Sequence, residues 1–141
     1  MTIAIGFVCI DGVLLCADTE HTGFTSKTHH AKIDNFEVPN GRVCFALSGS
    51  SALAWAAMEK CKKQLQKKAS DDLASDIEQI LDEEYRRNVL THPDYVNLEY
   101  QFLIGICATG KRVELYATTR TAMRRISNFE CIGIGQNWLL T

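Results

Sequence analysis

No run of apolar residues in this sequence approaches the ~20 residues that a helix needs to cross a membrane. The N-terminus also lacks the basic region, the long apolar region and the small-residue cleavage site of a secretory signal peptide. The formal net charge is only −2, which gives no reason to expect a nucleic acid or an anionic membrane as partner. We therefore expect a cytoplasmic protein that binds neither nucleic acid nor membranes.

Metal and cofactor motifs are equally scarce. None of the six cysteines belongs to a C-x-x-C pair, so we interpret them as small buried side chains in a reducing compartment. His29 and His30 are adjacent, and their side chains diverge in an extended chain, which disfavours a metal site. Thr109–Lys111 lacks the upstream glycine of a phosphate loop, and Gly133–Gly135 lacks the third glycine of a dinucleotide fingerprint. We predict no metal and no cofactor.

The 141 residues are enough for one domain with a substantial core, and a hydrophobic content of 46% is ordinary for a globular protein. Hydrophobic periodicity predicts strands, then two helices, then further strands. The helices are expected to begin after Ser50 or Ser51 and after Ser70, and to end near Lys68 and Val89. The strands are expected at 3–10, 13–18, 31–38, 42–47, 100–108, 112–118, 123–126 and 129–134. This order predicts an α+β domain in which two sheets pack together with helices outside.

The first two strands are expected to form a hairpin. Asp11-Gly12 is a strong signal for a two-residue turn, which would place Cys9 opposite Leu14 and Cys16 opposite Phe7. Both faces of strand 3–10 are apolar, so we expect this strand to be covered on both sides.

The threonine at position 2 is the most informative residue of the chain. Methionine is normally removed when the second residue is small, and removal of Met1 would leave Thr2 first, at the head of the hairpin. An N-terminal threonine carries a hydroxyl nucleophile and a free α-amine that can act as its base. Taken alone, Thr2 is better interpreted as an ordinary second residue. Only the other residues of the chain make a nucleophile the better interpretation.

Three further positions suit the same chemistry. Asp18 ends an apolar strand beside the hairpin, where a carboxylate can hold and orient a lysine. Lys32 lies within an apolar strand, and its positive charge near a hydroxyl would lower the pKa of that hydroxyl. Gly49 follows Ser48 where a strand turns into a helix, a turn that can point backbone N–H groups at an oxyanion. Each also has a plain structural interpretation: a strand end, a lysine at a strand edge and a helix start.

Together these residues resemble the proteasome β-subunit family, including its simpler bacterial relatives, over the whole chain. The matching positions are Thr2, Gly6-Phe7, Gly12, Asp18, Thr22, Lys32-Ile33, Ser48-Gly49, Gly133 and Gly135.

The resemblance implies a threonine-type endopeptidase. Thr2 would be the nucleophile, with its own α-amine, of reference pKa ~7.7–8.0, as general base. Lys32 would lower the pKa of the Thr2 hydroxyl, Asp18 would position Lys32, and the N–H of Gly49 would stabilise the oxyanion. Thr22 and Leu47 would contact the substrate, and Leu47 would favour apolar side chains at the cleavage site.

The resemblance also implies a four-layer αββα sandwich of the N-terminal nucleophile hydrolase class. Family members continue through further helices and strands, so we expect a single domain over residues 1–141 that is incomplete at its C-terminus. The implied partners are a peptide or unfolded-protein substrate, further copies of the chain in a homo-oligomeric ring, and an ATP-dependent unfoldase.

Two other functions stay open. The chain could be a non-catalytic structural or assembly subunit that keeps the fold and its interfaces, or an amidase that uses the same nucleophile on a small substrate. A Thr2→Ala variant separates the peptidase from the scaffold, because a scaffold needs no nucleophile.

Overall fold

The computed structural model of the chain describes residues 3–22, 27–49, 51–94 and 98–133. These residues form ten strands and two helices, most of them close to the predicted positions. The strands are β1 (Ile3–Val8), β2 (Val13–Ala17), β3 (Glu20–Thr22), β4 (Lys27–His29), β5 (Ile33–Val38), β6 (Gly41–Gly49), β7 (Tyr100–Ala108), β8 (Glu114–Thr119), β9 (Ala122–Ile126) and β10 (Phe129–Gly133). The helices are α1 (Ser51–Leu65) and α2 (Leu73–Asn88).

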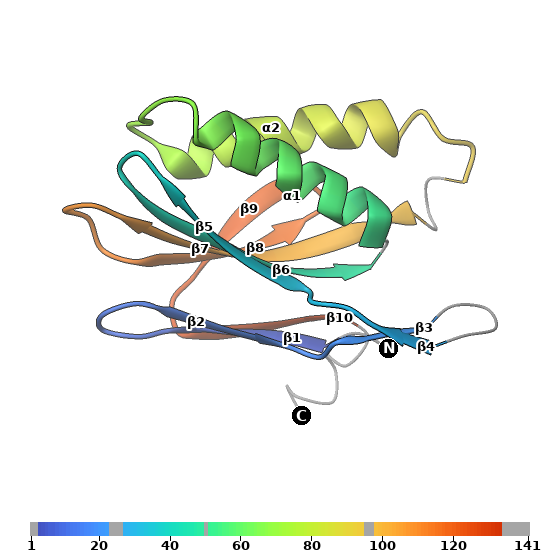
Figure 1. The fold of residues 1–141 in the computed structure, drawn as a ribbon, viewed down its shortest axis with the longest axis horizontal. Helices are drawn as coiled ribbons and strands as arrows, with labels where there is room; N and C mark the ends of the chain where they lie inside the picture. Colours follow the sequence, from blue (N-terminus) through green and yellow to red (C-terminus); the bar gives the residue numbers. More distant parts are fainter. Residues whose placement is uncertain (1–2, 23–26, 50, 95–97, 134–141) are drawn as a thin grey trace.

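All strand pairs are antiparallel, and eight of the ten strands belong to two main sheets. The larger sheet has the order β5-β6-β7-β8-β9, and the smaller has the order β10-β1-β2. The two short strands β3 and β4 pair with each other as a separate hairpin. Figure 1 shows both helices above the five-stranded sheet and the three-stranded sheet on its other side.

Two apolar layers hold this arrangement together. Side chains of α1, α2 and one face of the five-stranded sheet form the first, with Met58, Ile77, Phe45 and Phe102 fully buried. The second lies between the two sheets and includes Ala4, Ala46, Leu103, Leu115 and Ile132. Because side chains alternate along a strand, β6 and β7 contribute to both layers. The five-stranded sheet is therefore the middle layer of the molecule.

The predicted four-layer αββα sandwich is wrong. The described residues form three layers in the order helix, sheet, sheet, and they are mostly β. Both helices that the structure describes cover the same face of the five-stranded sheet. Among the described residues no helix covers the outer face of the three-stranded sheet, where Phe7, Leu14 and Phe129 are 38%, 52% and 51% exposed. The prediction that strand 3–10 is covered on both sides is wrong for the same reason.

The register of the first hairpin also differs from the prediction. Val8 pairs with Val13 and Phe7 pairs with Leu14. The amide of Cys9 donates to the carbonyl oxygen of Gly12 at 2.8 Å, so the turn is centred on Ile10-Asp11, one residue earlier than the predicted Asp11-Gly12. Cys16 consequently faces Ile5. This turn borders a cavity at this end of the molecule.

The second helix begins differently from the prediction as well. Asp72, and not Ser70, is its N-cap, and its carboxylate accepts a hydrogen bond from the amide of Ser75 at 3.1 Å. Ser70 instead accepts from the amide of Asp72 and donates to the side chain of Asp76. An aspartate suits this position because its negative charge also interacts favourably with the positive end of the helix dipole.

Candidate functional site

The structure brings Asp18 and Lys32 together at the N-terminal end of β1. Thr2 itself lies outside the described residues, and β1 begins with the next residue, Ile3. Asp18 comes directly after β2, and Lys32 comes directly before β5. The candidate site therefore lies between the N-terminal end of β1 in the three-stranded sheet and the N-terminal end of β5 in the five-stranded sheet.

Asp18 is tied to the backbone beside Thr2. Its carboxylate oxygen Oδ1 accepts a hydrogen bond from the amide of Ile3 at 3.0 Å. The amide of Asp18 in turn donates to the carbonyl oxygen of Ile3 at 3.1 Å. The nitrogen of Ile3 is the amide nitrogen of the peptide bond from Thr2, so this carboxylate lies one peptide unit from the predicted nucleophile.

Lys32 is a fully buried cation. The residue is only 2% exposed, and its ammonium Nζ donates to Asp18 Oδ1 at 3.0 Å. Nζ also donates to the backbone carbonyl of Glu20 in β3. The carbonyl of Lys32 accepts from the amide of Leu47 at 2.9 Å, which fastens the lysine backbone to β6. Three separate segments thus hold this one residue.

The ion pair affects how Asp18 titrates. Partial burial by itself would raise the pKa of the Asp18 carboxyl. The hydrogen bond from Ile3, together with the hydrogen bond and the charge of Lys32, outweighs burial and lowers that pKa below its ordinary value. Asp18 is therefore an anion at neutral pH, as a partner for a buried ammonium must be.

Gly49 lies at the end of β6 that adjoins Lys32, two residues beyond Leu47. Its backbone φ is +95°, a conformation that glycine adopts far more readily than other residues. A Cβ atom there would collide with the carbonyl oxygen of Glu99 and lie 2.8 Å from the Cα of Tyr100. Glycine is thus required at this exposed end of β6. The role of its N–H as an oxyanion donor stays a prediction.

The two predicted substrate contacts are placed differently from each other. Leu47 is 1% exposed, and its side chain packs in the apolar layer between the helices and the five-stranded sheet. Thr22 ends β3, where it pairs with Lys27. For both residues, contact with a substrate stays a prediction.

The sequence analysis missed two partners of the ion pair, the carbonyl of Glu20 and the amide of Ile3. Both are backbone groups that every non-proline residue possesses, so no side-chain pattern identifies them. The predicted pairing of strands 3–10 and 13–18 indicated the contact with Ile3 only indirectly, because it placed Asp18 close to the first residues of the chain.

The cysteines differ in part from the expectation of burial. Cys61 and Cys131 are buried, whereas Cys9 and Cys16 are exposed, and all six are free thiols. Burial raises the pKa of Cys61 to about 12 and that of Cys44 to about 11, so both stay protonated at neutral pH. Within the described ranges, no three His, Cys, Asp or Glu side chains are grouped so as to hold a metal ion. The helices in those ranges also include none that is long and apolar enough to cross a membrane.

Comparisons with known proteins identify the fold. No model of a protein family matches the sequence, and no curated protein matches it. Solved structures of Anbu do match. They include Anbu from Pseudomonas aeruginosa, described as a helical assembly (TM-score 0.79, 13% identity), and Anbu from Yersinia bercovieri, described as an ancestral beta-subunit (TM-score 0.78, 11% identity). A Gly-1 mutant of Anbu from Hyphomicrobium sp. strain MC1 matches with a TM-score of 0.77 and 16% identity.

These matches cover 94–95% of this chain but only 60–61% of the Anbu chains. The chain thus spans about three fifths of the length of the proteins it resembles. At such low identity the likeness shows the fold alone. It also corrects the family resemblance: the matching structures are Anbu proteins, and the identification with proteasome β-subunits was wrong.

Proposed function

We propose that this chain is a threonine-type hydrolase of peptide bonds, in which Thr2 becomes the nucleophile after removal of Met1. The observation that supports it best is the ion pair between the buried Lys32 and the half-buried Asp18, whose carboxylate accepts a hydrogen bond from Ile3, the residue after Thr2. Burying an ammonium costs several kcal/mol unless it is paired, and an apolar residue of similar size commonly serves stability as well or better. A buried, paired lysine beside a potential nucleophile is therefore better explained by chemistry than by packing.

In the proposed mechanism the α-amine of Thr2 accepts the proton of the Thr2 hydroxyl, directly or through a water molecule. The positive charge of Lys32 stabilises the developing alkoxide, and Asp18 keeps Lys32 in place. The oxygen attacks the peptide carbonyl, and the N–H of Gly49 stabilises the resulting oxyanion. Collapse of this intermediate releases the amine product and leaves an acyl ester on Thr2. Water then hydrolyses the ester and regenerates the threonine.

Peptides or unfolded proteins are the proposed substrates, with Thr22 and Leu47 near the bound chain. We further propose that copies of the chain assemble into a ring and that an ATP-dependent unfoldase supplies substrate. The likeness to Anbu is compatible with an oligomer, since the structure from Pseudomonas aeruginosa is described as a helical assembly.

The first experiment prepares the chain from a cleavable N-terminal fusion that leaves Thr2 as the first residue. The protein is incubated with a peptide epoxyketone, which requires both a threonine hydroxyl and its free α-amine, and intact mass is measured. We expect one adduct per chain and hydrolysis of fluorogenic peptides. Thr2→Ala should abolish the adduct and lower hydrolysis by about 10³-fold or more, whereas Thr2→Ser should retain both.

Two further variants control this result. Lys32→Met removes the buried charge but keeps an apolar side chain of similar length, and it should reduce the rate of adduct formation by about 10²-fold or more. Thr109→Ala changes an exposed threonine in the turn after β7 and should leave the rate unchanged. Peptide hydrolysis that survives Thr2→Ala would rule out the proposal. A panel that includes small amides separates a peptidase from an amidase.

A non-catalytic assembly subunit is the second candidate, and one observation favours it. Phe129, Phe7 and Leu14 are aligned across β10, β1 and β2 by the strand register, and all three are exposed. The rings of Phe7 and Phe129 lie 6.1 Å apart, so the three side chains form a continuous apolar row. Light scattering together with the adduct measurement distinguishes the candidates. A scaffold would assemble equally well with Thr2 or with alanine at that position, and its native sequence would form no epoxyketone adduct.

A further inference from the structure

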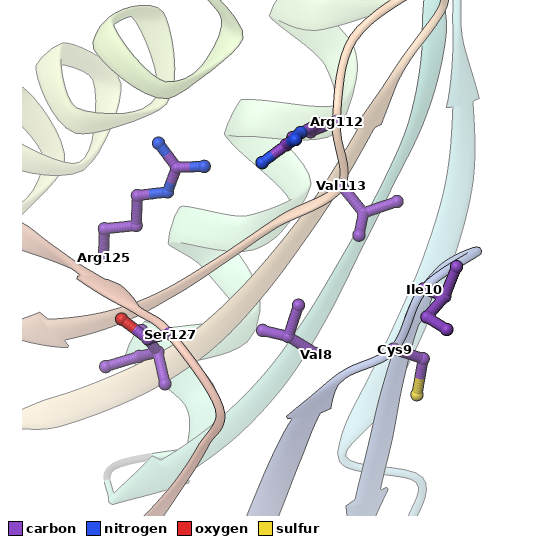
Figure 2. A pocket seen from close by; sticks show the side chains of 8 residues that line it. Val8, Cys9, Ile10, Arg112, Val113, Arg125 and Ser127 are labelled. Atoms are coloured by element: carbon purple, nitrogen blue, oxygen red, sulfur yellow. The ribbon is translucent and has the colours of Figure 1, made fainter.

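A cavity of about 530 Å³ lies at the opposite end of β1 from the candidate site. It is bordered by the β1–β2 turn, the β7–β8 loop and the segment after β9, and its walls include Val8, Ile10, Arg112, Val113, Arg125 and Ser127. Figure 2 shows the side chains of Arg112 and Arg125, which come from two different segments, pointing toward the helices, with Val113 near Arg112 and Val8 nearer the three-stranded sheet. The six residues of β1 separate the cavity from Asp18 by about 20 Å.

The two arginines of this cavity differ from the other arginines of the chain. The chain has seven, and five form ion pairs: Arg42 with Glu37, Arg86 with Asp82, Arg87 with Glu84, Arg120 with Glu99, and Arg124 with Glu130. Arg112 and Arg125 form no ion pair and no side-chain hydrogen bond with another residue in the described parts of the chain. Two guanidinium groups without an ion-pair partner among the described residues thus line the same cavity.

The rest of the wall supports one kind of ligand. No acidic side chain lines the cavity among the described residues, and apart from the arginines and Ser127 its side chains are apolar or a thiol. Arg112 also borders a neighbouring cavity that contains Asp71, Asp72 and Glu114. None of these carboxylates forms an ion pair with Arg112 among the described residues, so they reduce the positive potential around Arg112 without neutralising its charge.

We infer that this cavity binds an organic anion, with a carboxylate or phosphate head at Arg112 and Arg125 and an apolar body against Val8, Ile10 and Val113. A guanidinium presents a planar fork of donors that matches either head group in a bidentate manner. The volume is that of a pocket for a small organic molecule, a class of site that commonly combines apolar walls with a few placed polar groups. The site is separate from the proposed catalytic function, because none of its residues contributes to it.

Calorimetric titration of the full chain tests this inference with four probes: octanoate, octyl phosphate, inorganic phosphate and the neutral octanamide. We expect octanoate or octyl phosphate to bind at least tenfold more tightly than octanamide and than inorganic phosphate. Tighter binding of octanoate assigns the site to carboxylates, and tighter binding of octyl phosphate assigns it to phosphate esters. Equal affinity for octanamide, or for inorganic phosphate, would overturn the inference.

Variants show whether binding occurs at this cavity. The double change Arg112→Gln and Arg125→Gln should weaken binding of the preferred probe by at least tenfold. Arg124→Gln is the matched control, since it removes an adjacent exposed arginine that is paired with Glu130 at 2.7 Å and lies outside the cavity wall. Ile10→Asp places a carboxylate in the wall at a fully exposed position and should also weaken binding tenfold or more. Unchanged affinity in the double variant, with the fold retained by circular dichroism, contradicts the inference.

Discussion

The two main sheets bury their residues to very different extents. In the five-stranded sheet Phe45 and Phe102 are completely buried beneath the helices, and Leu103 and Leu115 are completely buried on the other face. In the three-stranded sheet the inner face is buried or partly buried, but Phe7, Leu14 and Phe129 on the outer face are about one third to one half exposed. The difference shows that the apolar character of a strand does not by itself determine how well it is covered.

The candidate site takes one charge from each sheet. Asp18 follows β2 of the three-stranded sheet, whereas Lys32 precedes β5 and is bonded through its carbonyl to β6 of the five-stranded sheet. The ion pair therefore spans the boundary between a doubly covered sheet and one whose outer face is not covered by any described helix or sheet. The geometry of the ion pair depends on the stability of both sheets. Substitutions in one sheet at a time test how much each sheet contributes to the free energy of unfolding.

The largest expected effect is in the doubly covered sheet. Phe45→Ala should lower the free energy of unfolding by about 3–5 kcal/mol, because it removes a buried ring and leaves a cavity. The Phe45 ring lies 5.3 Å from that of Phe102 and 6.0 Å from that of Phe36, so both neighbours lose a partner. Urea denaturation measures the change. A loss below about 1 kcal/mol would contradict the central position of this layer.

A smaller effect is expected at Gly49, the last residue of β6, which lies at the end of the five-stranded sheet that adjoins the site. Gly49→Ala should destabilise the protein by about 1–3 kcal/mol, because φ is +95° and the added methyl group meets the backbone of Glu99 and Tyr100. Gly12→Ala is a suitable control, since a Cβ atom at Gly12 meets nothing within 4 Å and its φ lies outside the left-handed range. Equal destabilisation by the two changes would show that the strain at Gly49 is not the cause.

On the open face of the three-stranded sheet the expected cost is lower still. Phe129→Ala should lower the free energy of unfolding by about 1 kcal/mol, since its ring is half exposed and leaves no closed cavity. Its tilted contact with Phe7 is lost in the change. If urea denaturation gives the same loss for Phe129→Ala as for Phe45→Ala, then a partner or a further segment covers this face in solution.

The smallest expected effect is a pH dependence that involves both sheets. The pKa of Asp18 is lower in the folded protein than in the unfolded chain, so its ionisation contributes stability above the unfolded pKa. That contribution is lost as the pH falls through the lowered pKa, in the acid range below about pH 4. Because the Asp18 side chain is 34% exposed, solvent screens much of the effect.

Comparison of the native sequence with Lys32→Met at pH 7 and pH 3 isolates this contribution. We expect the loss of stability on acidification to be smaller in the variant, since the methionine cannot favour the ionised form of Asp18. An identical pH dependence in both proteins would indicate that the backbone hydrogen bonds from Ile3 and Glu20 lower the pKa of Asp18 without help from Lys32.

The strands and helices could be predicted largely from local patterns, because alternation and capping are local signals. The hairpin register could not, since Asp11-Gly12 favours a turn on those two residues, whereas the turn forms on Ile10-Asp11. The number of layers was wrong for another reason. It came from a family resemblance, and short motifs around Thr2, Asp18 and Lys32 do not determine which helices complete a sandwich.

The candidate site was predictable to a similar degree. Asp18 and Lys32 stand out because an acid and a lysine border apolar strands, and the structure places them within 3.0 Å. Their contact with each other depends on how two sheets pack, which a linear pattern only suggests. The cavity of Arg112 and Arg125 had no signal in the sequence, because its walls come from segments over 100 residues apart.

The attachment of Lys32 has a consequence for how such a protein would mature. Its carbonyl is bonded to Leu47, and its ammonium is bonded to Asp18 and to Glu20, all of them beyond the first two residues of the chain. On the proposed mechanism the charged half of the site is thus assembled before the initiator methionine is cut. The precursor would be inactive only because Thr2 lacks a free α-amine. Removal of the methionine would then activate the protein without any rearrangement of the fold.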